Sequence, residues 1–161
     1  SGLLRLANEP IMPNVAVSLH ASTEELRNRL VPVNRTFGLA EIIEACRQLP
    51  LTKRRRITFE YVLLAHVNDS AQDARRLQAL LRGLKAKVNL IPLNEASGIS
   101  FRRPSDVRVD RFARTLSEGG MTVSVRKSRG RDIRAACGQL IVEGDSVGNE
   151  GKTARPHPTV T

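Results

Sequence analysis

The chain has 161 residues, of which 40% are hydrophobic and only 3% aromatic, so we expect one domain with an aliphatic core. Lysine and arginine exceed aspartate and glutamate by 26 to 16, which indicates a polyanionic partner such as nucleic acid; a basic surface without a partner is the alternative. The only cysteines, Cys46 and Cys137, form neither a disulfide framework nor a metal-ligand spacing, and no apolar run approaches the roughly 18 residues of a membrane span. The composition argues against a disulfide-rich secreted scaffold and a membrane partner, and we expect a reducing, cytoplasmic location.

Strand and helix signals alternate along the chain. Short apolar, β-branched runs indicate strands, and apolar residues at spacings of three and four indicate the helices between them. The expected strands are 14–19, 57–64, 87–93 and 121–125, and the expected helices run from 22 to about 30, from 38 to about 49, from 70 to about 83 and from 105 to about 119. Strands separated in this way by helices form parallel β/α units, either in an open sheet or in part of a barrel.

Capping residues and apolar stripes support the helix assignments. Ser22 and Glu25 form a capping-box pattern, in which Ser22 would be the N-cap of the first helix. Ser70 is expected to cap the third helix, with Asp73 in its first turn. Cys46 lies on the apolar stripe of the second helix, so we expect it to pack in the core.

The strand expected at 57–64 carries a carboxylate at its centre. Alternation places Thr58, Glu60, Val62 and Leu64 on one face. If that face is interior, Glu60 needs a polar partner or a ligand; a solvated strand face is the alternative.

Polar side chains follow the strands at their carboxyl ends. In parallel β/α folds, ligands gather at this edge of the sheet. The residues concerned are Ser18, His20, His66, Asn68, Asn94 and Arg126. A histidine after a strand is more often a loop residue with its hydrogen bonds satisfied, but the topology would bring all six to one edge.

A cysteine follows the last strand within a basic segment. Cys137 comes eleven residues after Arg126, and the segment that starts at Arg126 contains five cations and one carboxylate. Neighbouring guanidinium groups favour the thiolate, which is the nucleophilic form of cysteine. A small buried apolar residue is the more ordinary role for a free cysteine. We expect the folded domain to occupy residues 1–142 and residues 143–161 to form a disordered tail, because the tail has nothing to bury.

Several segments together resemble the RlmN/Cfr family of radical S-adenosylmethionine (SAM) enzymes. They are VSLHA at 17–21, FEYV at 59–62, HVND at 66–69, VNLIP at 88–92 with Asn94, and RG, DI and AACGQL between 129 and 140. The resemblance extends from Ser1 to about Leu140. It implies an α/β fold whose parallel β/α units form part of a radical-SAM-type partial TIM barrel.

The resemblance also implies an activity. Members of the family methylate an adenine of 23S ribosomal RNA, and the RlmN branch, which this sequence resembles more, acts at C2 and also on transfer RNA. The residues matching Ser18, Leu19, His20 and Asn94 would contact SAM, and Cys137 would be the residue that is first methylated on sulfur and then passes its carbon to the adenine. The cations expected to contact RNA are Arg102, Arg103, Arg126, Lys127, Arg129 and Arg131.

One departure from the family limits what this chain does alone. Such enzymes hold a [4Fe-4S] cluster with a Cys-x3-Cys-x2-Cys loop, and this sequence has no such loop. The family's amino-terminal domain is also missing, and the chain starts at Ser1 rather than at methionine. We therefore interpret the chain as the carboxyl-terminal half of the enzyme, inactive without the remainder.

Two other functions stay open on the sequence. The first is a truncated, non-catalytic RNA-binding module that keeps the basic face and lacks the chemistry. The second is a thiol-dependent enzyme that pairs Cys137 with His20 or His66, although nothing in the sequence places either histidine beside the sulfur. The oligomeric state is not indicated.

Overall fold

Four parallel strands form one sheet at the centre of the molecule. The structure is a computed structural model, and it describes residues 2–6, 8, 13–31, 36–95 and 98–127. The strands are β1 (Ala16–Ser18), β2 (Ile57–Leu63), β3 (Ala86–Pro92) and β4 (Thr122–Val125), and they lie in the order β1-β2-β3-β4. All three strand pairs are parallel. This arrangement confirms the predicted parallel β/α units.

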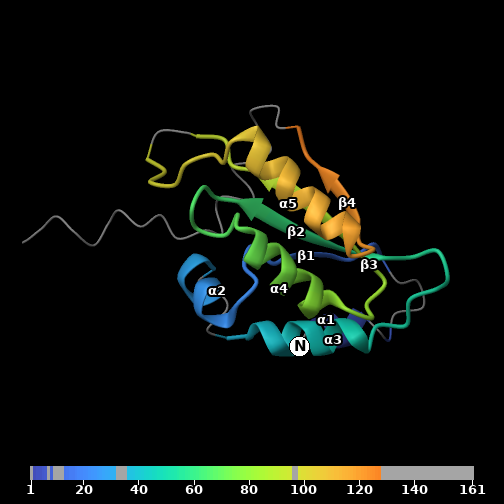
Figure 1. Cartoon of the computed structure of the whole chain (residues 1–161). Coiled ribbons are helices and arrows are strands. Elements are labelled where there is room, and N and C mark those ends of the chain that lie inside the picture. The colour runs from blue at the N-terminus through green and yellow to red at the C-terminus, as the bar shows by residue number, and fades with distance from the viewer. Residues whose placement is uncertain (1, 7, 9–12, 32–35, 96–97, 128–161) are drawn as a thin grey trace, which may run out of the picture.

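Helices connect the strands. They are α2 (Glu24–Leu30), α3 (Leu39–Arg47), α4 (Ala71–Leu81) and α5 (Asp106–Glu118), and a short α1 (Gly2–Leu6) precedes β1. In Figure 1, α4 and α5 lie in front of the strands and α3 runs beside α4. The sequence patterns did not predict α1. No helix within the described residues is long and apolar enough to cross a membrane.

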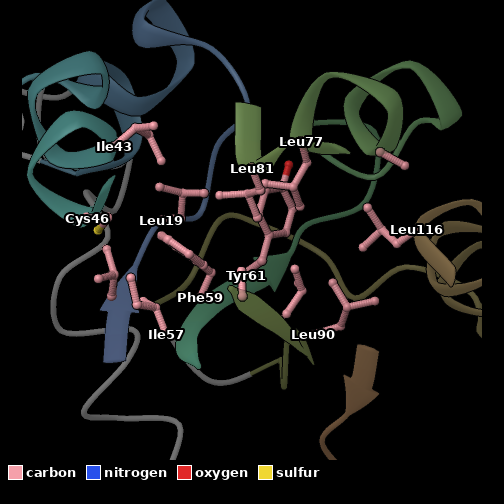
Figure 2. Close-up of a cluster of buried hydrophobic side chains, with 14 of the residues drawn as sticks. Leu19, Ile43, Cys46, Ile57, Phe59, Tyr61, Leu77, Leu81, Leu90 and Leu116 are labelled. Carbon is pink, nitrogen blue, oxygen red and sulfur yellow. The ribbon is translucent and has the colours of Figure 1, made fainter. Parts of the chain in front are cut away.

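The main core lies between the sheet and α3, α4 and α5. Ile57, Phe59 and Tyr61 point from β2 toward these helices and are fully buried (Figure 2). The Tyr61 ring packs on Phe112 of α5 with ring centroids 5.3 Å apart. Cys46 lies in the same cluster at 1% exposure, which confirms its predicted packing role. Aliphatic burial therefore attaches one face of the sheet to the helices.

The opposite face of the sheet changes character along the strands. Thr58 and Glu60 are only half-buried there, whereas Val62 and Leu64 are fully buried. The buried pair belongs to a second apolar cluster, whose other members are Ala21, Leu30, Val31, Ile91 and Leu93. This face is therefore polar at mid-strand and closed by apolar side chains near the carboxyl ends.

Helix α2 starts one residue later than the sequence indicates. Its N-cap is Thr23, whose hydroxyl accepts a hydrogen bond from Leu26 N–H at 3.3 Å, so the prediction of a Ser22 cap was wrong. The Ser22 hydroxyl instead donates to Asp73 Oδ1 of α4 at 3.2 Å. Ser22 therefore bonds to a residue distant in the sequence and does not cap the helix as the local pattern predicted.

The other helix boundaries follow their capping residues. Ser70 Oγ accepts from Asp73 N–H at 3.0 Å, and the Asp73 carboxylate accepts from Ser70 N–H at 3.2 Å, which confirms the predicted cap of α4. Gly83 follows α4 with φ of +80°, a conformation that favours glycine. Ser105 caps α5 as predicted.

Candidate functional site

A row of polar side chains crosses the sheet on the face away from α3, α4 and α5. The strand register aligns Ser18, Glu60, Asn89 and Ser124, one from each strand. Ser124 Oγ donates to Asn89 Oδ1 at 3.2 Å. Neighbouring strands lie about 4.8 Å apart, so the row spans roughly 14 Å. Hydroxyl, carboxylate and amide groups over that length suit a small ligand rich in hydroxyl and amino groups.

Glu60 lies at the centre of this row, and its carboxylate has no donor among the residues that the structure describes. Its side chain is half-buried. A partly desolvated carboxylate is costly unless a donor or cation reaches it. A hydrogen-bond donor on a bound ligand would therefore stabilise the Glu60 carboxylate.

Arg27 of α2 holds the end of β1. Its Nε donates to Leu19 O and its Nη2 donates to Ser18 O, both at 3.2 Å. Leu19 N–H donates to Glu60 O at 2.9 Å. The Leu19 side chain is fully buried in the helix-side core, so this residue offers a ligand only its backbone. Of the predicted SAM contacts on β1, Ser18 alone presents its side chain to the polar face.

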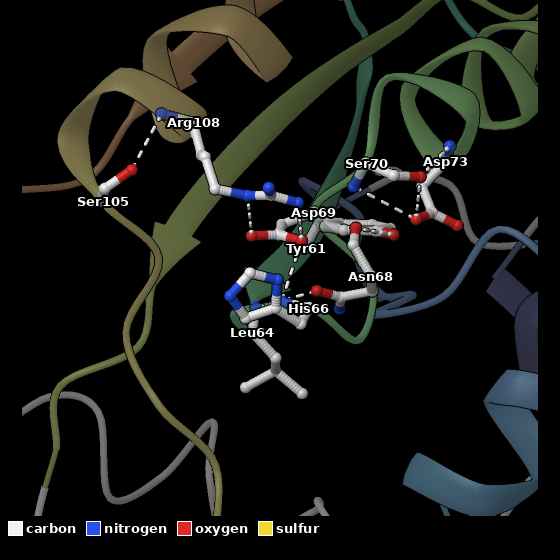
Figure 3. A network of polar contacts seen from close by, with 9 residues as sticks. All are labelled: Tyr61, Leu64, His66, Asn68, Asp69, Ser70, Asp73, Ser105 and Arg108. Carbon is white, nitrogen blue, oxygen red and sulfur yellow. Dashed lines mark hydrogen bonds and ion pairs between the residues drawn. The ribbon is translucent and has the colours of Figure 1, made fainter.

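His20 and Asn68 replace a neighbouring strand beyond the end of β1. His20 Nδ1 accepts from Val62 N–H at 3.1 Å. The Asn68 amide donates to Val62 O at 2.7 Å and to His20 O at 2.9 Å, while its oxygen accepts from Leu64 N–H at 2.7 Å; Figure 3 shows Asn68 beside Leu64. Both side chains are fully buried. They satisfy the backbone of β2 where β1 no longer does.

His20 is held in its neutral form. Burial, together with the nearby charge of Arg27, lowers the pKa of His20 from 6.5 to about 4. Its backbone has φ of 60°, and Nε2 is buried without a partner among the described residues. A sealed imidazole with its Nδ1 already engaged is unsuited to activating a thiol, which argues against a Cys137–His20 pair.

An ion pair fixes the loop after β2 to α5. Arg108 Nε and Nη2 donate to Asp69 Oδ2 and Oδ1 at 2.7 and 2.8 Å (Figure 3). The Asp69 side chain is only 1% exposed, and its Oδ1 also accepts from His66 N–H at 3.0 Å. The hydrogen bond from Arg108 to Asp69 raises the pKa of the guanidinium. The loop is therefore rigidly placed, and His66 stays exposed on it.

Other predicted site residues lie at the same carboxyl edge. Asn94 is half-buried directly after β3, beside Leu93, whose N–H donates to Leu63 O at 3.1 Å. Arg102 O accepts from Ala65 N–H at 2.9 Å, so the loop with the exposed residues Arg102 and Arg103 crosses the end of β2. Arg126 N–H donates to Leu90 O at 2.8 Å and extends β4, and the exposed Lys127 follows.

Three predicted site residues lie outside the described residues. They are Cys137, Arg129 and Arg131, and the predicted tail 143–161 lies there too. Their roles stay predictions. The described cysteine, Cys46, is unsuited to chemistry because burial raises the pKa of its thiol to about 11.

The described residues differ in how well they fit the two implied cofactors. The hydroxyl, carboxylate and amide side chains of the polar row are of the kinds that hydrogen-bond to the hydroxyl and amino groups of SAM. No group of three His, Cys, Asp or Glu side chains in the described ranges could hold a metal ion, so they do not fit an iron–sulfur cluster.

Sequence reasoning missed Asn89, Ser124 and Arg27. In β3 a signal was present: polar Lys87 and Asn89 alternate with apolar Val88 and Leu90, which marks a strand with one polar face. For Arg27 no signal exists, because its acceptors are backbone carbonyls brought near by the fold.

Comparisons with known proteins agree with this geometry. No family model matches the chain. It is 52% identical over 147 residues to a dual-specificity RNA methyltransferase RlmN from Syntrophotalea carbinolica, a match that covers 89% of this chain and 40% of that protein. The corresponding protein of Geobacter sulfurreducens is 56% identical over 127 residues, covering 79% and 35%.

Solved structures give the same result. A radical SAM methyltransferase from Sphaerobacter thermophilus superposes with a TM-score of 0.78 at 51% identity, over 88% of this chain and 42% of that one. A domain of a pyruvate-formate lyase-activating enzyme from Bacteroides vulgatus reaches a TM-score of 0.51 at 12% identity, which shows a shared fold only.

The chain spans about 40% of the length of the curated relatives it matches. The similarity covers up to 97% of this chain, so it includes the strands that carry the polar row. The chain therefore belongs to the RlmN family of radical SAM RNA methyltransferases and corresponds to their carboxyl-terminal half.

Proposed function

We propose that this chain is part of an enzyme that methylates C2 of an adenine in 23S ribosomal RNA, with transfer RNA as a second substrate. The observation that carries the proposal is about 50% identity, over most of the chain, to proteins named dual-specificity RNA methyltransferases. The polar row on the sheet and the cations at its carboxyl edge support it, because they suit a nucleoside cofactor and a polyanionic substrate respectively.

SAM would bind along the polar row. Ser18, Glu60 and Asn89 would hold its hydroxyl and amino groups, with Asn94 at the carboxyl end and the buried backbone of Leu19 and His20 as the wall. When bound, SAM supplies the methyl group and, together with a reduced [4Fe-4S] cluster, the radical that activates the carbon. The cluster ligands must come from outside this chain, because its two cysteines are Cys46 and Cys137.

Cys137 would carry the methyl group to the adenine. Accepting a methyl group from a sulfonium requires a deprotonated sulfur. Cations of the segment that begins at Arg126 would favour the thiolate by electrostatic attraction. The RNA-contacting set would be Arg102, Arg103, Arg126, Lys127, Arg129 and Arg131.

The proposal assigns catalysis to the whole enzyme and not to this chain alone. Without the cluster loop, the chain would bind neither the metal nor a complete SAM molecule. We expect it to act in the cytoplasm, where ribosomal and transfer RNA are modified, and to depend on the amino-terminal part of the same enzyme.

Mass spectrometry on the full-length protein tests the proposal. Peptides containing Cys137 should carry a methyl group after expression in cells, and Cys137→Ala should abolish RNA methylation. Cys46→Ala is the matched control and should keep activity, because that cysteine only packs in the core. Activity that survives Cys137→Ala, or a Cys137 that is never methylated, would rule the mechanism out. Ribosomal and transfer RNA are digested separately, which shows which of them is methylated. The nucleosides released show whether the product is 2-methyladenosine or 8-methyladenosine.

One observation favours a second function. Because the sequence lacks a cluster loop, a protein limited to this chain would be a non-catalytic RNA-binding module. It would bind RNA in a salt-sensitive way, with affinity unchanged by Cys137→Ala. Absence of RNA binding at low salt would exclude it.

A further inference from the structure

A second basic surface lies at the amino-terminal edge of the sheet, opposite the carboxyl edge that carries the predicted RNA contacts. The segments 47–56 and 82–85 precede β2 and β3 and contain no carboxylate. Their cations are Arg47, Lys53, Arg54, Arg55, Arg56, Arg82 and Lys85. We call these seven residues the amino-edge basic surface. None of them belongs to the set proposed above to contact RNA near the reacting adenine.

Hydrogen bonds between the two segments join them into one continuous surface. Arg47 Nη1 donates to Arg82 O at 3.3 Å, and Lys85 Nζ donates to Leu51 O at 3.4 Å. Ile57 N–H donates to Lys85 O at 2.8 Å, which aligns the starts of β2 and β3. The positive charge is therefore concentrated and not scattered along the chain.

Helix termini explain only part of this charge. Arg47 ends α3 and Arg82 caps α4, and cations there offset the partial negative charge of a helix carboxyl terminus. Lys53 and Arg54 lie in the connection to β2, beyond any helix end. Both are exposed, and no described side chain pairs with them. The adjacent charges of Lys53 and Arg54 repel one another, so a polyanionic partner would stabilise this arrangement.

The distance to the reacting edge defines what the surface contacts. Strand β2 has seven residues and a strand of that length spans about 23 Å. A nucleotide held at the carboxyl edge does not reach the amino edge, whereas a folded RNA of many nucleotides does. Arginine forms bidentate hydrogen bonds with phosphate and reads no sequence in doing so.

We propose that the amino-edge basic surface binds the phosphate backbone of the RNA substrate at a place remote from the methylated adenine. The inference rests on the proposed function for the identity of the polyanion. It adds a second contact that would increase affinity for long, folded RNA and leave the chemical step unaffected.

Charge-neutralising variants of the full-length protein test this inference. The test variant combines Lys53→Gln, Arg54→Gln and Arg82→Gln. The matched control combines Arg75→Gln, Arg111→Gln and Arg114→Gln, which removes three exposed charges from the outer faces of α4 and α5. Binding of full-length substrate RNA is measured by fluorescence anisotropy at several salt concentrations. The test variant should bind at least about tenfold more weakly at 0.1 M salt, with a salt slope smaller by about 2 to 3, and the control should change far less.

Kinetics with two RNA lengths separate this surface from the reacting edge. For long RNA the test variant should raise KM with kcat unchanged, and for a short stem-loop that contains the adenine it should have no effect. Equal losses in the test and control variants, or unchanged RNA binding, would overturn the inference. Unchanged RNA binding together with lost association with an acidic protein would overturn it in favour of a protein partner. Charge-dependent RNA binding without any methylation by the wild type would contradict the proposed function alone.

Discussion

At the scale of single residues, the buried side chains of His20 and Asn68 form hydrogen bonds with the backbone of β2. Strand β1 ends at Ser18, which pairs with Glu60, whereas β2 continues to Leu63. The side chains of His20 and Asn68 supply the missing hydrogen-bond partners to the backbone of Val62 and Leu64. A buried histidine in this role must stay neutral, because a proton on Nδ1 would face the Val62 N–H.

Stability should therefore depend on pH through His20. Its pKa falls from 6.5 in the unfolded chain to about 4, so the native state resists a proton that the unfolded state accepts. The contribution is complete above pH 6.5 and is lost as pH falls toward 4, in total about 3 kcal/mol. Urea unfolding at pH 7, 6 and 5 measures the loss. His20→Asn keeps an acceptor and tolerates the positive φ, and it should show no such loss between pH 7 and 5. A wild-type curve that is flat over this range would contradict the assignment.

Glu60 should contribute to SAM affinity. Glu60→Gln keeps the shape of the side chain and removes its charge, and charge-assisted hydrogen bonds contribute about 1.5–3 kcal/mol. We expect the Kd for SAM of the full-length protein to rise about tenfold or more, as measured by calorimetry. Glu118→Gln, on exposed α5 surface, is the control and should bind normally. An unchanged Kd in Glu60→Gln would mean that its partner is a protein cation and not the cofactor.

At the scale of elements, the Asp69–Arg108 pair joins the loop after β2 to the first turn of α5. Its carboxylate is buried and its guanidinium lies on α5, so the pair is a direct polar contact between the loop and that helix. Removing Arg108 would leave the Asp69 carboxylate buried, with the His66 N–H as its one donor among the described residues. Buried charges without partners are destabilising.

Arg108→Ala should lower the free energy of unfolding by about 2 kcal/mol, a value reduced from that of a fully buried pair because Arg108 is 37% exposed. Chemical denaturation measures the change. Arg76→Ala is the control: its contact with Asp73 is 3.7 Å long and its side chain is 48% exposed, so its loss should cost less than about 0.5 kcal/mol. Similar losses of unfolding free energy in the two variants would show that the Asp69–Arg108 pair stabilises the fold no more than an exposed ion pair does.

At the scale of the whole molecule, the candidate site is one-sided. The polar row covers one flank of a ligand, whereas small-molecule sites generally enclose most of the ligand surface. The remaining contacts would come from the part of the relatives that this chain does not span.

Ligand stabilisation should therefore differ between the chain and the full-length protein. A ligand that binds only the native state raises stability by RT ln(1 + [L]/Kd), about 2.7 kcal/mol at one hundred times Kd. Saturating SAM should raise the Tm of the full-length protein by several degrees and leave that of this chain nearly unchanged. Differential scanning fluorimetry gives both values. A clear shift for the chain alone would mean that the polar row suffices for binding.

Local patterns predicted the elements well because their determinants are local. The apolar stripe through Cys46, the cap at Ser70 and the alternation through Glu60 each depend on residues within one or two turns or strand repeats. The family resemblance was equally readable, since it rests on linear segments. These features could be read from local patterns alone, and so could the presence of polar residues after the strands of a parallel sheet.

Tertiary structure decided which polar groups meet. Ser22 does not cap its helix but donates a hydrogen bond to Asp73, 51 residues away. Arg27 donates to the carbonyls of Ser18 and Leu19. The alignment of Glu60 with Asn89 follows from the register of two strands, and the joining of segments 47–56 and 82–85 follows from the same pairing. Such contacts depend on the relative position of elements distant in sequence, which packing sets and no local pattern contains.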